Sequence, residues 1–225
     1  MNMFIDAVTP KSQTSSMKCA KVRPHMRKLL AIVSILALGL LGPLPARAAP
    51  GSPSDVVRHF YATLLDTMKH GPDLGPKGRY AKLEPIVLAS FDVPFMTRMS
   101  VGLSWGRLSP EEKARAAKAF ARYITATYAS EFSKFDGERF DVLAEEKVKH
   151  GTVVRSRIVP SDDDPVAINY VLHDNDTAWQ IRDVYLTGTI SELATRRSEF
   201  TGILRTGGIE GLIAQLNKKA DELIG

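Results

Sequence analysis

The chain has 225 residues and a formal net charge of +5, which taken alone suggests a basic protein. Most of that charge lies at the N-terminus: residues 1–48 contain seven of the 30 Lys and Arg residues and one of the 25 Asp and Glu residues, which leaves 23 basic and 24 acidic residues in 49–225. The resulting net charge of −1 argues against a nucleic-acid-binding protein, because such domains usually carry clustered bases on a strongly positive surface.

The first 48 residues have the three parts of a secretory signal sequence. Arg27 and Lys28 precede an uncharged run over residues 29–42, and Ala46-Arg47-Ala48 forms an A-x-A cleavage site. The run is shorter than the roughly 20 residues that span a bilayer. We therefore predict cleavage after Ala48 and a single exported, soluble domain over 49–225, with an uncleaved membrane anchor as the alternative. Residues 1–25 are either a long basic region of this signal or the result of an upstream start that the cell does not use.

The first part of the domain has helical periodicity. The clearest start is Ser109-Pro110-Glu111-Glu112, which combines an N-cap Ser, Pro at the first helical position and Glu three residues after the cap. The predicted segments are a helix that Ser54 caps and His70 ends, a loop over 74–78, a short helix over 80–89, a helix from Phe91, and a helix from Ser109 to Phe132 or Phe135.

The pattern then changes to that of strands, predicted over 140–148, 152–159, 166–173 and 178–187. The short turns between them indicate an antiparallel meander. Val166, Ile168, Tyr170 and Leu172 alternate with more polar residues, so one face of the third strand points to the interior. Two helices, over 190–204 and 209–223, complete an α+β fold: N-terminal helices, a curved antiparallel sheet of about four strands and two C-terminal helices. Layers of this kind enclose an apolar cavity where side chains do not fill the wedge between them.

Motifs of catalysis and metal binding are missing. The histidines His59, His70, His150 and His173 lack the spacing of metal ligands, and there is no nucleophile elbow or phosphate-binding loop. The single cysteine, Cys19, leaves with the signal sequence. We therefore expect no metal, no cofactor and no enzymatic activity.

Asp183 carries the one enzymatic alternative. It lies inside an apolar strand between Arg182 and Val184, and a buried carboxylate in a cone-shaped α+β pocket can act as a general base. The competing interpretation is a partly exposed Asp that pairs with a neighbouring Arg or fixes the corner before the next helix.

Several short motifs resemble one known family in their order and spacing. They are Phe91-Asp92, Met99, Gly102-x-x-Trp105, Leu108-Ser109-Pro110-Glu111, Thr127-Tyr128, Phe132, Phe135, Tyr170-x-Leu172, Trp179-x-Ile181-x-Asp183-Val184, Ile190-Ser191, Arg197-x-x-Phe200 and Ile203-Leu204-Arg205-x-x-Gly208-Ile209-Glu210-Gly211-Leu212. Over residues 53–222 the chain resembles the MlaC, or toluene-tolerance, family of periplasmic phospholipid-binding proteins. Residues 187–200 more particularly resemble its hopanoid-associated, HpnM-type branch. The chain departs from the family at Thr189, which stands where Gly usually precedes Val-Ser or Ile-Ser.

The resemblance implies a non-enzymatic periplasmic carrier whose cavity takes the lipid tails and leaves the headgroup near solvent. It also implies an inner-membrane ABC-type transport complex as partner, transient membrane contact, and a phospholipid or hopanoid-type cargo. Burial of lipid tails stabilises such a complex by about 0.8 kcal/mol per CH₂. The candidate cavity wall consists of Trp105, Tyr128, Ile168, Tyr170, Leu172, Ile181, Val184, Tyr185 and Phe200. Arg197 is a candidate headgroup contact or a helix-surface salt bridge.

Two alternatives stay open at this point. One is an NTF2-like enzyme that acts on a hydrophobic substrate with Asp183 as base. The other is an adaptor with a filled core that only contacts membrane-protein partners, since most large apolar residues are explained equally well as core. A polar mouth beside an apolar cavity favours the carrier, and a packed interior favours the adaptor.

Overall fold

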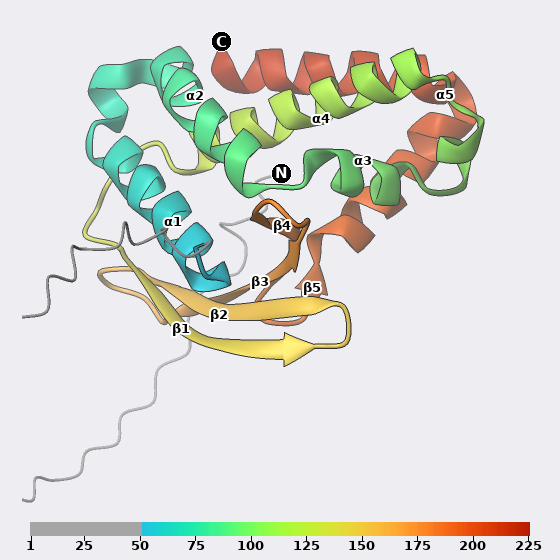
Figure 1. The fold of residues 1–225 in the computed structure, drawn as a ribbon. Helices are drawn as coiled ribbons and strands as arrows, with labels where there is room; N and C mark the ends of the chain where they lie inside the picture. Colours follow the sequence, from blue (N-terminus) through green and yellow to red (C-terminus); the bar gives the residue numbers. More distant parts are fainter. Residues whose placement is uncertain (1–50) are drawn as a thin grey trace, which may run out of the picture. The chain divides into compact units, whose positions relative to one another are not determined.

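The computed structural model describes residues 51–225 (Figure 1). Residues 1–50, with the predicted signal sequence and its cleavage site after Ala48, lie outside the described residues. The elements are α1 (Pro53–Lys69), α2 (Gly71–Ser90), α3 (Val93–Val101), the 3₁₀ helix η1 (Gly102–Arg107), α4 (Pro110–Glu131), β1 (Arg139–Val148), β2 (Gly151–Val159), β3 (Val166–Asp174), β4 (Trp179–Leu186), β5 (Ile190–Ser191) and α5 (Glu192–Ile224).

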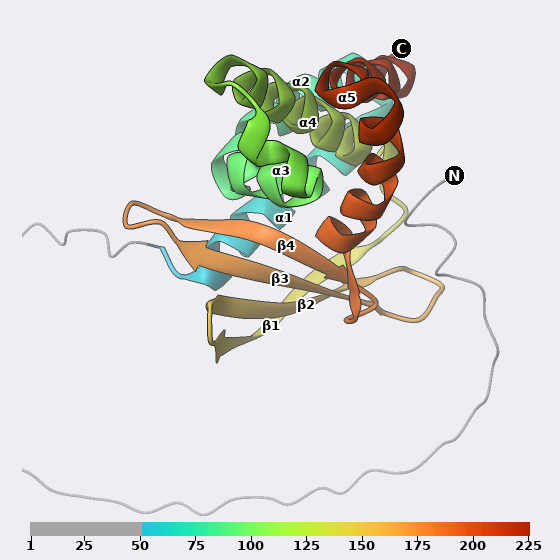
Figure 2. The same cartoon turned by 90° about the vertical axis from the view of Figure 1, so that its right-hand side faces the viewer.

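The five strands form one antiparallel sheet in the order β1-β2-β3-β4-β5. Figure 2 shows that the helices lie on one side of this sheet. Helices α1, α3 and α5 all contact β4, and α1 also contacts β1 and β2. The predicted α+β class and the meander are confirmed, with a short fifth strand in addition to the four predicted. None of the helices in residues 51–225 combines the length and hydrophobicity that a membrane span needs.

The inner face of the sheet depends on a bulge in β4. Ile168, Tyr170 and Leu172 of β3 are buried, as the alternation predicts. Their partners in β4 are Leu186, Val184 and Ile181, and the register shifts between the last two pairs. Because successive side chains alternate across a regular strand, the extra residue allows both Ile181 and Val184 to face the helices.

The bulge also joins the sheet to α3. The Arg182 guanidinium donates a 2.8 Å hydrogen bond to the Asp92 carboxylate and lies 4.3 Å from the centre of the Phe95 ring. The backbone N–H of Asp92 donates to the carbonyl oxygen of Ile181 at 2.9 Å. These contacts fix the start of α3 on β4, where Asp92 is the N-cap.

Two helix starts test the capping predictions. Ser109 caps α4 with Glu112 in a capping box, and the helix ends with Phe132 as its C-cap, as predicted. The predicted cap Ser54 is wrong. Ser52 caps α1 in a capping box with Asp55, and Pro53 at the first helical position strengthens this earlier start.

The predicted loop over residues 74–78 is also wrong. Residues 71–90 are helical except at Gly75, where φ is 61° and the axis turns. The buried Arg79 stabilises this region, because its guanidinium donates to the carbonyl oxygens of Ala129 at 2.7 Å and Gly71 at 2.8 Å. The bond to Ala129 ties α2 to α4 across 50 positions of sequence and is not visible in the local sequence, and the bond to Gly71 lies within α2.

The two predicted C-terminal helices form one element, α5, which has a sharp break within it. Gly208 has a φ of 59°, which divides α5 at the place where two helices were predicted to meet. The helix begins at Glu192 rather than the predicted Ile190, because Ile190 and Ser191 pair with β4 as β5. The turn between β4 and β5 has positive φ at Thr187 and Gly188, and Thr189 N–H donates to the carbonyl oxygen of Leu186, which is the pattern of a type I′ hairpin.

Candidate functional site

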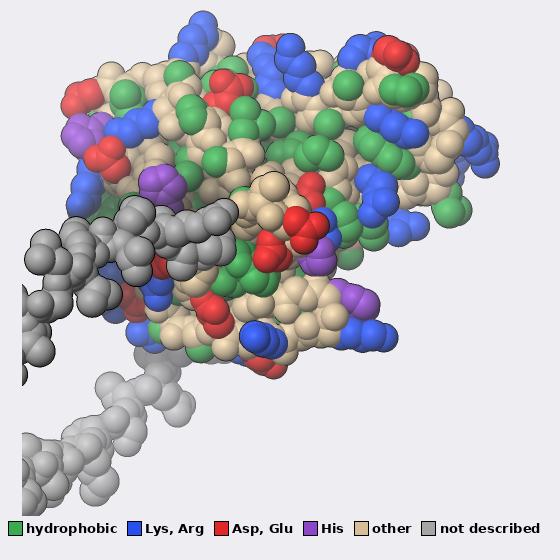
Figure 3. Space-filling view, viewed as in Figure 1, with side chains coloured by type: hydrophobic (Ala, Val, Ile, Leu, Met, Phe, Trp, Pro, Cys, Tyr) green, Lys and Arg blue, Asp and Glu red, His purple; other side chains and the backbone are tan. Residues whose placement is uncertain are grey.

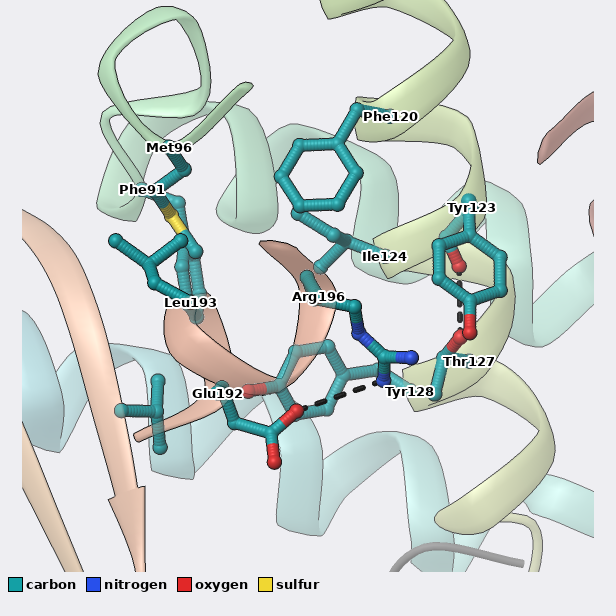
Figure 4. Close-up of a pocket in the computed structure, with 11 residues that line it drawn as sticks. Phe91, Met96, Phe120, Tyr123, Ile124, Thr127, Tyr128, Glu192, Leu193 and Arg196 are labelled. Carbon is teal, nitrogen blue, oxygen red and sulfur yellow. Dashed lines mark hydrogen bonds and ion pairs between the residues drawn. The ribbon is translucent and has the colours of Figure 1, made fainter. Parts of the chain in front are cut away.

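A small cavity of about 60 Å³ lies between α3, α4, the start of α5 and β4 (Figure 4). Its wall is mainly aromatic and aliphatic. The lining residues are Phe91, Met96, Phe120, Tyr123, Ile124, Thr127, Tyr128, Val184, Glu192, Leu193 and Arg196. On the face seen in Figure 3, hydrophobic side chains gather over α3 and α4, two of the helices that form this wall.

Tyr128 joins the cavity wall to the aromatic core. Its ring lies 5.1 Å from Phe60 and 5.9 Å from Phe91, between ring centres. Phe60 in turn packs edge-on against Phe91 and Tyr170. Burial raises the pKa of the Tyr128 hydroxyl well above its ordinary value. The hydroxyl is therefore a neutral polar group at the cavity wall, able to hydrogen-bond without carrying charge.

Two charged side chains of α5 form the polar end. Arg196 Nη2 lies 3.4 Å from the Glu192 carboxylate, and the two side chains are only 10% and 13% exposed. Arg196 Nη1 donates a 2.7 Å hydrogen bond to Glu199, whose side chain is 43% exposed. The guanidinium also lies 5.2 Å from the centre of the Tyr123 ring. Figure 4 shows the Glu192 and Arg196 side chains pointing toward each other across this end.

The Glu192 carboxyl has a strongly shifted pKa. Burial raises it from 4.5 to about 7, the positive charge of Arg196 opposes the shift, and the negative charges of Glu199 and Asp183 add to it. A carboxyl in this position changes its charge near neutral pH. The polar end of the cavity can therefore exist with or without a net positive charge.

The structure brings two of the nine predicted wall residues to this cavity, Tyr128 and Val184. Five others are buried in the surrounding core: Ile168, Tyr170, Leu172, Ile181 and Phe200. Trp105 and Tyr185 are half-buried. Their role as wall residues stays a prediction for a wider form of the cavity.

The predicted headgroup contact Arg197 is exposed and lies outside the cavity, with its guanidinium beside Gly102. Its neighbour Arg196, which the sequence analysis missed, lines the cavity instead. The helical period contains the missing signal. Residues 192, 196 and 200 lie four apart on one face, and Phe200 was already assigned to the interior.

Asp183 fixes the corner at the start of α5. Its carboxylate accepts hydrogen bonds from Ser191 Oγ at 2.7 Å, Val184 N at 2.8 Å and Leu193 N at 3.2 Å. Burial raises its pKa, and these hydrogen bonds oppose the rise. Asp183 does not line the cavity, and Ser191, which it holds, is the N-cap of α5. The structure thus favours the corner interpretation over a general base.

Metal binding has no support in the described part of the chain. Nowhere in residues 51–225 do three His, Cys, Asp or Glu side chains come together in a way that would hold an ion.

Comparisons with known proteins agree with the fold. The model of the family described as "MlaC protein" matches residues 58–218. The phospholipid-binding protein from Ralstonia solanacearum, solved in complex with a phospholipid, superimposes with a TM-score of 0.68 at 20% sequence identity. The match covers 78% of this chain and 100% of that one. At this identity the likeness shows a shared fold, whereas the family match extends over most of residues 51–225. The chain belongs to the MlaC family.

Proposed function

We propose that this protein binds a phospholipid and carries it through the periplasm. The observation that carries the proposal is an apolar cavity with the Glu192–Arg196 ion pair in its wall, in an MlaC-family fold. Lipids are amphipathic in the same way as this cavity. Proteins of the MlaC family are periplasmic lipid carriers and not enzymes, and a structural relative of the same fold holds a phospholipid.

The free energy of binding comes from the burial of the lipid tails. Each CH₂ group that leaves water gains about 0.8 kcal/mol, so two acyl chains provide ample affinity once the ordering of the chains is subtracted. Phe91, Met96, Phe120 and Ile124 offer the surface for these tails. The headgroup then lies toward Arg196, where a charged group finds partners.

The cavity must widen to take a lipid. A space of about 60 Å³ is well below the roughly 300–1,000 Å³ of sites for larger ligands. We infer that the first part of α5, residues 192–207, moves away from α4 about the break at Gly208. Widening in this direction adds Phe200 to the wall, because its ring packs against Phe120 at 5.8 Å between centres.

The proposal includes a second type of cargo. A hopanoid-type lipid is the second candidate, supported by the resemblance of residues 187–200 to the HpnM-type branch. The type I′ turn at Thr187 and Gly188 lies in the same stretch, where this chain departs from the usual family sequence. A rigid polycyclic lipid and a two-chain phospholipid differ in shape, so a binding assay with both separates them.

Export and partners complete the proposal. Cleavage after Ala48 releases the domain over 49–225 into the periplasm. Delivery there requires docking to an inner-membrane transport complex and transient contact with a membrane surface. The adaptor alternative has less support, because a polar end beside an apolar cavity serves no purpose in a purely docking protein.

Transfer of lipid from vesicles tests the proposal. Delipidated protein is incubated with phospholipid vesicles, separated by flotation and examined by native mass spectrometry. We expect one phospholipid per chain in the vesicle-free fraction. A protein that stays lipid-free under these conditions, with phospholipid and with hopanoid-containing vesicles alike, would rule out the carrier function.

A further inference from the structure

A buried ion pair, Glu192–Arg196, lies in the wall of the cavity. Eleven residues line the cavity, and Glu192 and Arg196 are the two charged ones. A buried ion pair contributes little net stability compared with apolar packing of similar volume. Its place in the wall of an apolar cavity therefore suggests a role in binding the ligand.

We propose that Arg196 binds the phosphate of the lipid headgroup and that Glu192 is an internal anion which this phosphate replaces. The inference rests on the proposed function and specifies its ligand chemistry: a lipid with a phosphate group, as opposed to a neutral lipid with the same tails.

The geometry of Arg196 suits this role. A guanidinium carries five N–H donors and binds phosphate through two parallel hydrogen bonds. Nη1 is held by Glu199 at 2.7 Å on the more exposed side, and Nη2 points toward Glu192 at 3.4 Å. The contact with Tyr123 at 5.2 Å keeps the guanidinium plane in place. Glu199 thus holds Nη1, while Nη2 lies on the side of Glu192, which lines the cavity.

The geometry of Glu192 suits an anion that can be exchanged. Charge-assisted hydrogen bonds are ordinarily about 2.7–2.9 Å long, so its 3.4 Å contact with Arg196 is a weak one. Within residues 51–225 the Glu192 carboxylate accepts this single hydrogen bond, although its side chain is nearly buried. A phosphate that forms shorter hydrogen bonds with Arg196 can therefore replace the Glu192 carboxylate at little cost in free energy.

The exchange includes a proton. A phosphate beside Arg196 also lies beside Glu192, and two adjacent negative charges favour protonation of the carboxyl. The charged or titratable groups around it are Arg196 and Glu199 of α5, Asp183 of β4, and Tyr128 and Tyr123 of α4. Because the pKa of Glu192 is already about 7, the carboxyl gives up its charge near neutral pH when the phosphate arrives. Phospholipid affinity should then fall as pH rises through this value.

The test compares two lipids with identical tails, dioleoylphosphatidylglycerol and dioleoylglycerol, on the full protein at pH 6 and pH 8. We expect wild-type protein to bind the phospholipid about tenfold more weakly at pH 8 than at pH 6, and the diacylglycerol equally at both. Arg196→Gln should weaken phospholipid binding by about tenfold or more and leave diacylglycerol binding unchanged. Glu192→Gln should retain phospholipid binding and lose its pH dependence.

A neighbouring residue provides the matched control. Arg197→Gln removes the adjacent exposed guanidinium, which lies outside the cavity, and should keep the pH dependence. If Arg196→Gln does not fold, as read by circular dichroism, Arg196→Lys keeps the charge without the fork and should show a reduced preference for the phospholipid. Equal preference in the wild type and the Arg196 variant would overturn the inference while leaving the carrier function intact. If the wild type binds neither lipid, the proposed function itself fails.

Discussion

Arg196 and Glu192 lie one helical turn apart at the start of α5, with Nη2 3.4 Å from the carboxylate, in the wall of a cavity that is otherwise uncharged. An (i, i+4) pair on a helix surface contributes only a few tenths of a kcal/mol. In this pair both side chains are nearly buried, so their charges interact strongly with each other and with anything that enters the cavity. The relationship gives a titratable centre to an apolar site, and the pH dependence of stability follows from it.

Glu192 should make the protein less stable as pH rises toward 8. Its pKa is about 7 in the folded protein and 4.5 as the ordinary value, so the folded state binds more protons between these values. The stabilising effect of the protonated carboxyl is complete below about pH 4.5 and is lost as pH rises through 7. We expect Glu192→Gln to remove about 2–3 kcal/mol of the difference in unfolding free energy between pH 5 and pH 8.

The measurement is chemical denaturation of wild type and variant across this range. Because other carboxyl groups titrate in both proteins, the quantity that matters is the difference between the two curves. Parallel curves for wild type and Glu192→Gln would show that Glu192 has an ordinary pKa.

Filling the cavity should block lipid uptake. Ile124 is half-buried and lines the cavity, so Ile124→Trp places a larger side chain in the space for the tails. Lipid uptake from vesicles should be lost, with unfolding free energy lowered by no more than about 1–3 kcal/mol. Ile213→Trp is the matched control, because Ile213 is half-buried on α5 outside the lining set. Equal uptake by the two variants would place the lipid elsewhere.

Asp183 should matter for stability rather than for any reaction. Asp183→Ala leaves Ser191 Oγ and the Leu193 N–H without their acceptor, and the unfolding free energy should fall by about 1–3 kcal/mol. Asp162→Ala, in the exposed turn after β2, should change it by less than about 0.5 kcal/mol. Thermal denaturation of both variants checks this. A stable Asp183→Ala protein would show that the corner does not depend on this carboxylate.

The start of α2 should tolerate no side chain. A Cβ on Gly71 would lie 1.9 Å from the carbonyl oxygen of Ser133, so Gly71→Ala should lower the unfolding free energy by about 1–3 kcal/mol. Gly202→Ala meets no atom within 4 Å and should raise it by about 0.5–1 kcal/mol, since Ala favours helix. Urea denaturation of the pair distinguishes a steric clash from a general effect of replacing glycine. Similar behaviour of the two variants would contradict the close packing at Gly71.

The parts of the fold that local chemistry determines could be predicted from the sequence. The capping box at Ser109 and the apolar alternation in β3 are confirmed, because each depends on residues only a few positions apart. The same capping rule also predicts a cap at Ser52, since Pro53 and Asp55 complete its pattern.

The site was harder to predict because it depends on tertiary packing. The bulge at Arg182 places Ile181 and Val184 on one face, and it comes with a contact to Asp92, 90 positions away in sequence. A basic residue in a helix is ordinarily expected to be exposed, which explains why Arg196 was overlooked beside Arg197. Its burial depends on the Glu192 and Glu199 partners and on the Tyr123 ring from α4.

The most direct test of the central claim is to identify what the protein carries in its own cell. Full-length protein is purified from its native host without detergent, extracted with organic solvent, and the extract is quantified by mass spectrometry against protein concentration. The account predicts close to one phosphate-containing lipid per chain, and much less in the Ile124→Trp variant purified in the same way. The absence of any stoichiometric lipid from the wild-type protein would contradict it.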